Sequence, residues 1–204
     1  MITTKAEFQR RYEEIEEYLA YIEGLEKVTG LSVTLMATMK ASALLMLYNL
    51  VESTMTNLVQ AVFDHLRQKS IGLTGMNDVM KIMILGNIKK RNPANLVEKM
   101  RREALDIAIA SYDKTSAFSG NVDTQKIRET LKEFGVTSTT PLKEPVLLEI
   151  KTARNDLAHG SKSFADAGKN YSAKDLREKQ MKVGKLLEKT INAFENYISS
   201  KAYA

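Results

Sequence analysis

The sequence predicts an all-α protein, and three observations support this fold class. Glycine and proline, the residues that end helices, are scarce, with 10 Gly and 3 Pro in 204 residues. Apolar residues recur at three- and four-residue spacing over long stretches, which is the period of an amphipathic helix. No segment alternates between apolar and polar residues for long enough to predict a strand. We expect one domain over residues 1–204.

The N-terminal third predicts two helices. The first should be capped by Thr4 and fray after Lys27, with an apolar stripe at every third or fourth position. That stripe consists of Phe8, Tyr12, Ile15, Leu19 and Ile22. The second should cover about residues 35–69, and it is apolar over so much of its circumference that we place it at the centre of the domain.

The middle of the chain, about residues 72–141, is expected to be a helical insertion between the first and last helix pairs. A short helix over 79–85, ended by the glycine that follows it, should lead through a basic loop to a helix over 94–112. Asp123 should cap a further helix that ends before Gly135.

The C-terminal third predicts two more helices. One should run from about 145 to 158, and after a loop containing Gly160 and Gly168 the last should begin near Ser172. The last helix has a long apolar stripe that consists of Leu176, Val183, Leu186, Leu187, Ile191, Phe194 and Ile198. The predicted architecture is therefore an antiparallel helical bundle with a helical insertion.

Composition excludes several classes of site. The chain has no Cys and only two His residues, His65 and His159, so disulfides, thiolate nucleophiles and Cys- or His-rich metal sites are not expected. We expect no metal and no cofactor. The net charge of +5 allows anionic partners without requiring them. The N-terminus lacks the apolar run of a signal peptide and no apolar stretch is long enough to span a bilayer, so we expect a cytoplasmic protein with no membrane partner.

One segment suggests chemistry, because it places an Arg and a His at the end of a predicted helix. Arg154 and His159 are five positions apart, which puts them about 140° apart around a regular helix. They share a face only if the helix unwinds near His159, as Gly160 permits. Asn155 is four positions before His159, shares its face, and is expected to orient the imidazole.

An Arg and a His at one place suit phosphate chemistry. The guanidinium binds a phosphate and stabilises developing charge, while the imidazole moves a proton. On RNA, such a pair would let a 2′-hydroxyl attack its own adjacent phosphate without a metal, and a homodimer would supply two pairs. From the spacing alone a simpler interpretation is favoured, in which Arg154 pairs with a carboxylate and His159 caps its own helix.

The surrounding residues change this balance. The string KTARNDLAHG at 151–160, followed by Ser163-Phe164, resembles the signature of the HEPN superfamily, and LYNLVES at 47–53 resembles the matching helix of its prokaryotic toxin-type branch. This resemblance implies a helical bundle that dimerises so that two Arg-x4-His motifs face one cleft. It also implies that Arg154 and His159 are catalytic, with Asn155 and Asp156 supporting them.

Many HEPN proteins are metal-independent endoribonucleases, and several are toxins of toxin–antitoxin or antiphage systems. The resemblance therefore implies RNA cleavage that leaves a 2′,3′-cyclic phosphate, and a cognate antitoxin protein as partner. Members that pair with a nucleotidyltransferase antitoxin carry a Tyr two residues after the His. Ser161 stands at that position, so silencing through that Tyr is not expected. The alternative is a non-catalytic HEPN module that binds nucleotide, RNA or a protein partner.

Four basic residues are candidates for contact with the RNA backbone, although a solvated surface explains them nearly as well. They are Lys89, Lys90, Arg91 and Lys151. Two polar residues in the apolar second helix, Asn49 and Glu52, either contact the Arg154 region or satisfy a buried network, and the sequence does not choose between these roles.

Overall fold

The computed structural model describes residues 1–89, 118, 120–137 and 145–204, with only the backbone described at 87–89. Its elements are α1 (Ile2–Leu25), α2 (Val33–Gln68), the 3-10 turn η1 (Leu73–Gly75), α3 (Asp78–Lys89), α7 (Thr124–Phe134), α8 (Pro145–Ala158), α9 (Phe164–Gly168) and α10 (Ala173–Ser199). Every regular element in these ranges is helical, and the all-α prediction is confirmed.

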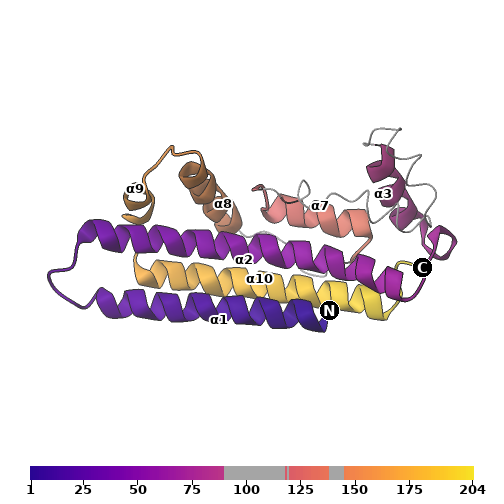
Figure 1. Ribbon diagram of the computed structural model, residues 1–204, viewed down its shortest axis with the longest axis horizontal. Helices are drawn as coiled ribbons and strands as arrows, with labels where there is room; N and C mark the ends of the chain where they lie inside the picture. Colours follow the sequence, from indigo (N-terminus) through magenta and orange to yellow (C-terminus); the bar gives the residue numbers. More distant parts are fainter. Residues whose placement is uncertain (90–117, 119, 138–144) are drawn as a thin grey trace.

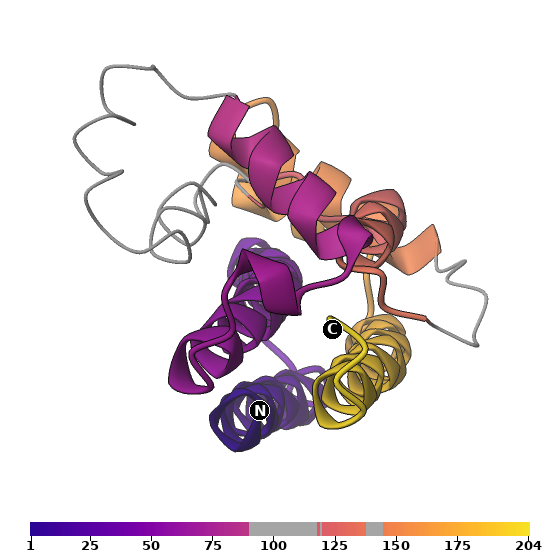
Figure 2. The ribbon, with the colours of Figure 1, turned by 90° about the vertical axis from the view of Figure 1, so that its right-hand side faces the viewer.

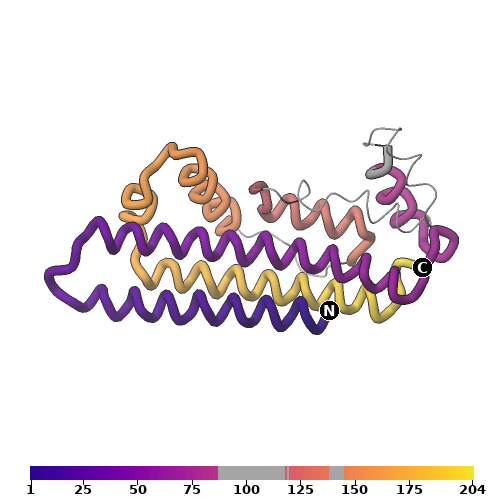
Figure 3. The backbone as a smooth tube through the Cα atoms, in the orientation of Figure 1, coloured from indigo at the N-terminus to yellow at the C-terminus, as the bar shows by residue number. Residues whose placement is uncertain are grey.

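The three longest helices form an elongated rod. α1 runs antiparallel to α2 and α10, and the three lie side by side along the long axis of the molecule (Figures 1 and 3). Viewed from the end, they occupy the three corners of a triangle (Figure 2). The stripes predicted for the first and last helices face this core: Leu19, Ile22, Leu187 and Phe194 are fully buried. Burial of these stripes holds the rod together.

The shorter helices form a layer along one side of α2 (Figure 1). α8 and α9 pack directly on α2, and α3 packs on α7. α7 reaches the rod through Phe134, whose ring centroid lies 5.8 Å from that of Phe63 in α2 and 6.1 Å from that of Phe194 in α10. This layer places α8, the helix that carries the Arg-x4-His motif, against α2.

The helix boundaries near the motif follow local sequence signals. Asp123 caps α7 by accepting a hydrogen bond from the backbone N–H of Lys126, and Gly135 ends that helix in a left-handed conformation with φ of 69°. Ser172 caps α10 in a capping box with Asp175. These ends agree with the predictions.

Two predicted helix ends are wrong. α1 begins at Ile2, so Thr4 lies inside the helix and is buried rather than capping it. α3 continues through Gly86 to Lys89, and part of the predicted basic loop is therefore helical. A single glycine costs a helix interior only about 1 kcal/mol, which is too little to end it. The helix predicted over 94–112 lies outside the described residues.

α9 was not predicted from the sequence, and it occupies part of the predicted loop between Gly160 and Ser172. Ser163 caps it by accepting a hydrogen bond from the N–H of Asp166. Gly168 at its end lies so close to α2 that a Cβ there would come within 1.8 Å of the Ala37 carbonyl oxygen. Glycine is therefore needed for this packing rather than for a loop.

α2 is also long and apolar enough, by length and composition, to cross a membrane. This was not expected from the sequence, in which each uninterrupted apolar run is short. The same two properties are found in core helices of globular proteins, and α2 packs against α1, α8, α9 and α10.

Candidate active site

The Arg-x4-His motif occupies the last turn of α8 and the loop that follows it. The N–H of His159 still donates to the Asn155 carbonyl at 3.0 Å, but Gly160 has φ of 70° and the N–H of Ser161 turns back to the Asp156 carbonyl at 2.8 Å. This is a glycine-based C-terminal cap. The helix therefore ends at Ala158, between Arg154 and His159, close to the glycine that permits it to unwind.

Arg154 is half-buried between α8, α2 and the turn that precedes α7. Its guanidinium carbon lies 5.3 Å from the centre of the Tyr48 ring, a cation–π arrangement. Its Nη1 donates to the Asn155 side-chain oxygen at 3.1 Å. Asn155 was expected to orient the imidazole of His159, whereas the structure pairs it with the guanidinium.

His159 lies at the exposed end of the helix. Among the described residues, none forms a hydrogen bond or ion pair with its side chain. Asp156, one turn earlier, forms an ion pair with Lys162 at 2.7 Å. The imidazole is thus accessible, while the acidic neighbour expected to support it is engaged by the loop that follows.

Two side chains of α2 complete the surroundings of Arg154. Glu52 accepts a hydrogen bond from the backbone N–H of Gly120 at 3.1 Å, and the Tyr48 hydroxyl accepts one from the N–H of Val122 at 3.2 Å. Burial raises the pKa of Tyr48, so its hydroxyl stays neutral. Glu52 thus joins a polar network with the turn that lies next to Arg154, and no hydrogen bond or ion pair between the Glu52 carboxylate and the Arg154 guanidinium is observed among the described residues, whereas Asn49 is exposed.

Sequence reasoning missed Tyr48 and Gly120 as parts of this site. Tyr48 was noted only as one residue of the segment 47–53 that resembles a HEPN helix, with no role at the site, and Gly120 was given no role within the predicted insertion. The spacing of Tyr48 and Glu52 offered one signal, because residues four apart on a helix share a face. The approach of Gly120 to Arg154 is a tertiary contact that no local pattern encodes.

Lys151 is half-buried and forms an ion pair with Asp123. Burial raises the pKa of the Asp123 carboxyl, but hydrogen bonds from Lys151 and from the backbone outweigh this effect and hold it below its ordinary value. An RNA phosphate would therefore compete with this carboxylate for Lys151. Of the other proposed RNA contacts, Lys90 and Arg91, and the side chain of Lys89, lie outside the described residues.

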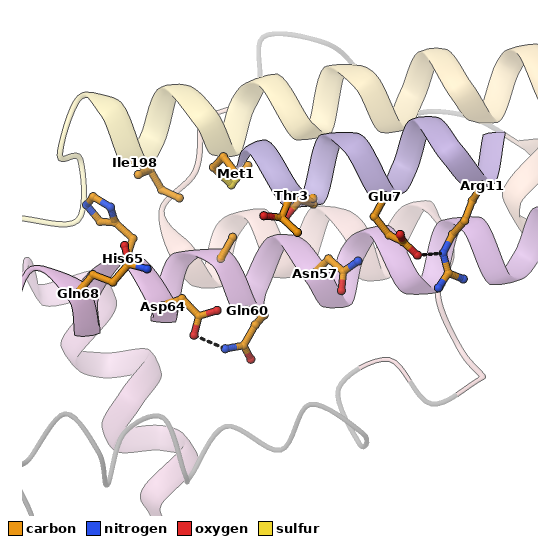
Figure 4. A pocket seen from close by; sticks show the side chains of 12 residues that line it. Met1, Thr3, Glu7, Arg11, Asn57, Gln60, Asp64, His65, Gln68 and Ile198 are labelled. Atoms are coloured by element: carbon orange, nitrogen blue, oxygen red, sulfur yellow. Dashed lines mark hydrogen bonds and ion pairs between the residues drawn. The ribbon is translucent and has the colours of Figure 1, made fainter. Parts of the chain in front are cut away.

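Two surface hollows are candidates for a binding site, and neither is lined by Arg154 or His159. One, of about 430 Å³, is lined by α9 and by the loops on either side of it, including Ser161, Asn170 and Tyr171. A larger one of about 570 Å³ lies between the start of α1 and the C-terminal half of α2, and contains no motif residue (Figure 4). His65 lines the larger hollow, and its Nε2 lies 3.1 Å from the Tyr203 hydroxyl.

Within the described ranges, no three His, Asp or Glu side chains lie close enough together to hold a metal ion. The sequence of residues 3–203 matches the family described as HEPN_MAE_28990-like HEPN. Neither the curated proteins nor the solved structures contain a match to the chain.

Proposed function

Because this chain belongs to the HEPN_MAE_28990-like HEPN family, we propose that it is a metal-independent endoribonuclease in which Arg154 and His159 act on the scissile phosphate. HEPN domains are often ribonucleases or nucleotide-binding modules. The observation that carries the proposal is that the last turn of α8 holds a guanidinium in place, at Arg154, and that the end of the same helix carries an accessible imidazole, at His159.

The proposed reaction uses the RNA itself as the nucleophile. His159 takes the proton from a 2′-hydroxyl, the 2′-oxygen attacks the adjacent phosphorus, and the bond to the 5′-oxygen breaks as that oxygen gains a proton. Arg154 stabilises the charge that develops on the phosphate oxygens. The products carry a 2′,3′-cyclic phosphate and a 5′-hydroxyl. The hollow of about 430 Å³ that is lined by the loop after His159 and by α9 offers space for a flanking nucleotide.

The reaction needs both a base and an acid, and one chain supplies one His159. We propose that the protein acts as a homodimer in which two motifs face one cleft, so that the second His159 protonates the leaving oxygen. We also propose that the protein is the cytoplasmic toxin of a toxin–antitoxin or antiphage system, restrained by an antitoxin protein. The dimer meets the need for two proton-transfer groups, whereas the toxin role and the antitoxin are proposed from the resemblance of 47–53 and 151–160 to the toxin-type HEPN branch.

The decisive experiment incubates the purified protein with single-stranded and structured RNA in excess chelator. His65→Ala is the matched control for His159→Ala, because it removes the other histidine at a site remote from the motif. We expect wild type and His65→Ala to cleave, and His159→Ala to lose about 100-fold to 10 000-fold of the rate, as for other general acid–base residues.

Cyclic phosphate ends on the products would identify the proposed reaction. Cleavage by folded His159→Ala at the wild-type rate would contradict the assignment of the residue. No cleavage of any RNA by wild type would favour the non-catalytic module. A growth test in bacteria examines the toxin role separately: expression should arrest growth, and Arg154→Ala or His159→Ala should relieve the arrest.

A further inference from the structure

The turn that precedes α7 lies against the guanidinium of Arg154. A Cβ at Gly120 would come within 2.5 Å of Arg154 Nη1 and 2.9 Å of its Cζ, distances that real Cβ atoms do not show. Gly120 is buried and has φ of 71°, a conformation that residues with side chains rarely adopt. The backbone conformation therefore favours glycine at this position, and any larger residue would displace the guanidinium.

α2 fixes the position of this turn. Glu52 accepts a hydrogen bond from the N–H of Gly120, and Tyr48 accepts one from the N–H of Val122. The two side chains are one helical turn apart on the same face of α2, so they hold two points of one short segment. Val122 is also buried in the core, which anchors the end of the turn that leads into α7.

Tyr48 contacts Arg154 as well as the turn. Its hydroxyl binds the turn, while its ring lies beneath the guanidinium at 5.3 Å. The guanidinium of Arg154 thus lies among an aromatic ring of α2, the backbone at Gly120 and the Asn155 side chain. The Asn155 side-chain oxygen accepts a hydrogen bond from Arg154 Nη1. Among the described residues, this oxygen is the only acceptor of a hydrogen bond from the guanidinium, so Nε and Nη2 keep the two donors with which an arginine binds a phosphate.

We propose that Tyr48, Glu52, Gly120 and Val122 form an arginine clamp, which positions the guanidinium of Arg154 for the phosphate. This inference rests on the proposed function for its catalytic consequence. None of the four residues is placed against the substrate. They are positioning residues that act through Arg154, and the clamp ties the C-terminal part of the predicted insertion to the site.

The first test substitutes the glycine. Gly120→Ala places a methyl group where the guanidinium now lies, and a displacement of about 1 Å is expected to lower kcat about 100-fold. Gly30→Ala is the matched control, because Gly30 also has a positive φ, 84°, but has no atom within 4 Å of the added Cβ. We expect Gly30→Ala to cleave at the wild-type rate. Equal activity of both folded variants would overturn the proposal.

The second test asks whether Glu52 acts by holding the turn at Gly120 or through the charge or proton of its own carboxylate. Glu52→Gln keeps an oxygen that can accept the Gly120 N–H, whereas Glu52→Ala removes the acceptor. We expect Glu52→Gln to retain most of the wild-type kcat and Glu52→Ala to lose about tenfold or more, with KM changed less than kcat. A loss in Glu52→Gln as large as that in Glu52→Ala would show that the carboxylate charge, not the clamp, is what matters.

A readout independent of activity follows the Nε–H of Arg154 by NMR, identified by its absence in Arg154→Lys. The Tyr48 ring should shift this resonance away from the position of a free arginine. Gly120→Ala should return it towards that position, and Gly30→Ala should leave it unchanged. If wild type does not cleave RNA but the resonance responds in this way, the clamp stands and the proposed function fails. If wild type cleaves and Gly120→Ala leaves the resonance unchanged, the clamp fails.

Discussion

The side chain of Arg154 is enclosed by α2, by the turn before α7 and by its neighbour Asn155, whereas the imidazole of His159, five residues later, reaches solvent from the end of the same helix. A group that binds a phosphate and stabilises charge gains from being fixed in advance, since reorganisation then does not add to the barrier. A group that moves a proton must reach the 2′-hydroxyl or the leaving oxygen of an RNA that arrives from solution. The contrast between the two side chains thus matches the two proposed roles.

Chemical rescue should give the largest difference between the two positions. His159→Ala is expected to lose cleavage by about 100-fold or more, and added imidazole should restore part of it, because the side chain that it replaces is accessible. Arg154→Ala should lose a comparable amount, but added methylguanidinium should restore little, because the vacated space is enclosed. The measurement is the initial cleavage rate in chelator with increasing concentrations of each compound.

Equal rescue of both variants would contradict the difference in enclosure. An imidazole response by Arg154→Ala would show nonspecific buffer catalysis, which His65→Ala and wild type control for in the same series.

The free energy of unfolding should also differ between alanine variants at Arg154 and at His159. Arg154→Ala removes a cation–π contact and the packing of a half-buried stem, and is expected to lower the free energy of unfolding by about 2 kcal/mol. His159→Ala removes an exposed side chain and should change it by less than about 0.5 kcal/mol. Urea denaturation followed by circular dichroism measures both. A large loss in His159→Ala would mean that the imidazole has packing partners.

The same division explains which parts of the site could be predicted from the sequence. Arg154 and His159 were selected by the resemblance of 151–160 to the HEPN signature rather than by their spacing, the end of α8 before Gly160 follows from glycine at a helix end, and the amphipathic stripes predict the buried faces of α1 and α10. The surroundings of Arg154 could not be predicted in this way. They depend on Gly120 lying 34 positions before the arginine in the chain and next to it in space, and on the crossing of α8 over α2.

Local signals also misled where a single residue type was given too much weight. Gly86 was expected to end α3 and Gly168 to lie in a loop, yet one sits within a helix and the other packs a helix onto α2. Glycine marks either a break or a close approach, and only the tertiary structure distinguishes the two. Thr4 shows the same limit for a capping residue, since its side chain is buried within α1.

The ion pair between Lys151 in α8 and Asp123 at the start of α7 gives a test that depends on pH. The pKa of Asp123 is lower in the folded protein than its ordinary value, so its stabilising effect is fully present above about pH 4 and is lost as the pH falls through the lower folded pKa. Asp123→Asn keeps a good helix cap but leaves Lys151 half-buried without its partner. We expect a loss of about 1.5 kcal/mol at pH 7, smaller than for a fully buried pair.

The difference in unfolding free energy between wild type and Asp123→Asn should shrink as the pH is lowered below 4. A difference that is constant with pH would show that the cap, rather than the ion pair, carries the effect. Gln125→Ala, at an exposed position in the first turn of the same helix, controls for general loss of helix stability.

The smallest expected loss of cleavage is for a substitution next to His159, at Gly160. Gly160→Ala retains the left-handed conformation at a cost of about 1 kcal/mol in unfolding free energy, and its Cβ meets no atom within 4 Å. Because His159 is not packed against the fold, small shifts of the loop should matter little, and we expect cleavage to fall by less than about tenfold. Gly120→Ala has a similar backbone penalty but displaces Arg154, so its larger loss of kcat would come from the guanidinium alone. Suppose instead that Gly160→Ala lost as much activity as Gly120→Ala at equal stability. His159 would then require a geometry as fixed as that of Arg154. The contrast between an enclosed phosphate-binding group and an accessible proton-transfer group would not hold.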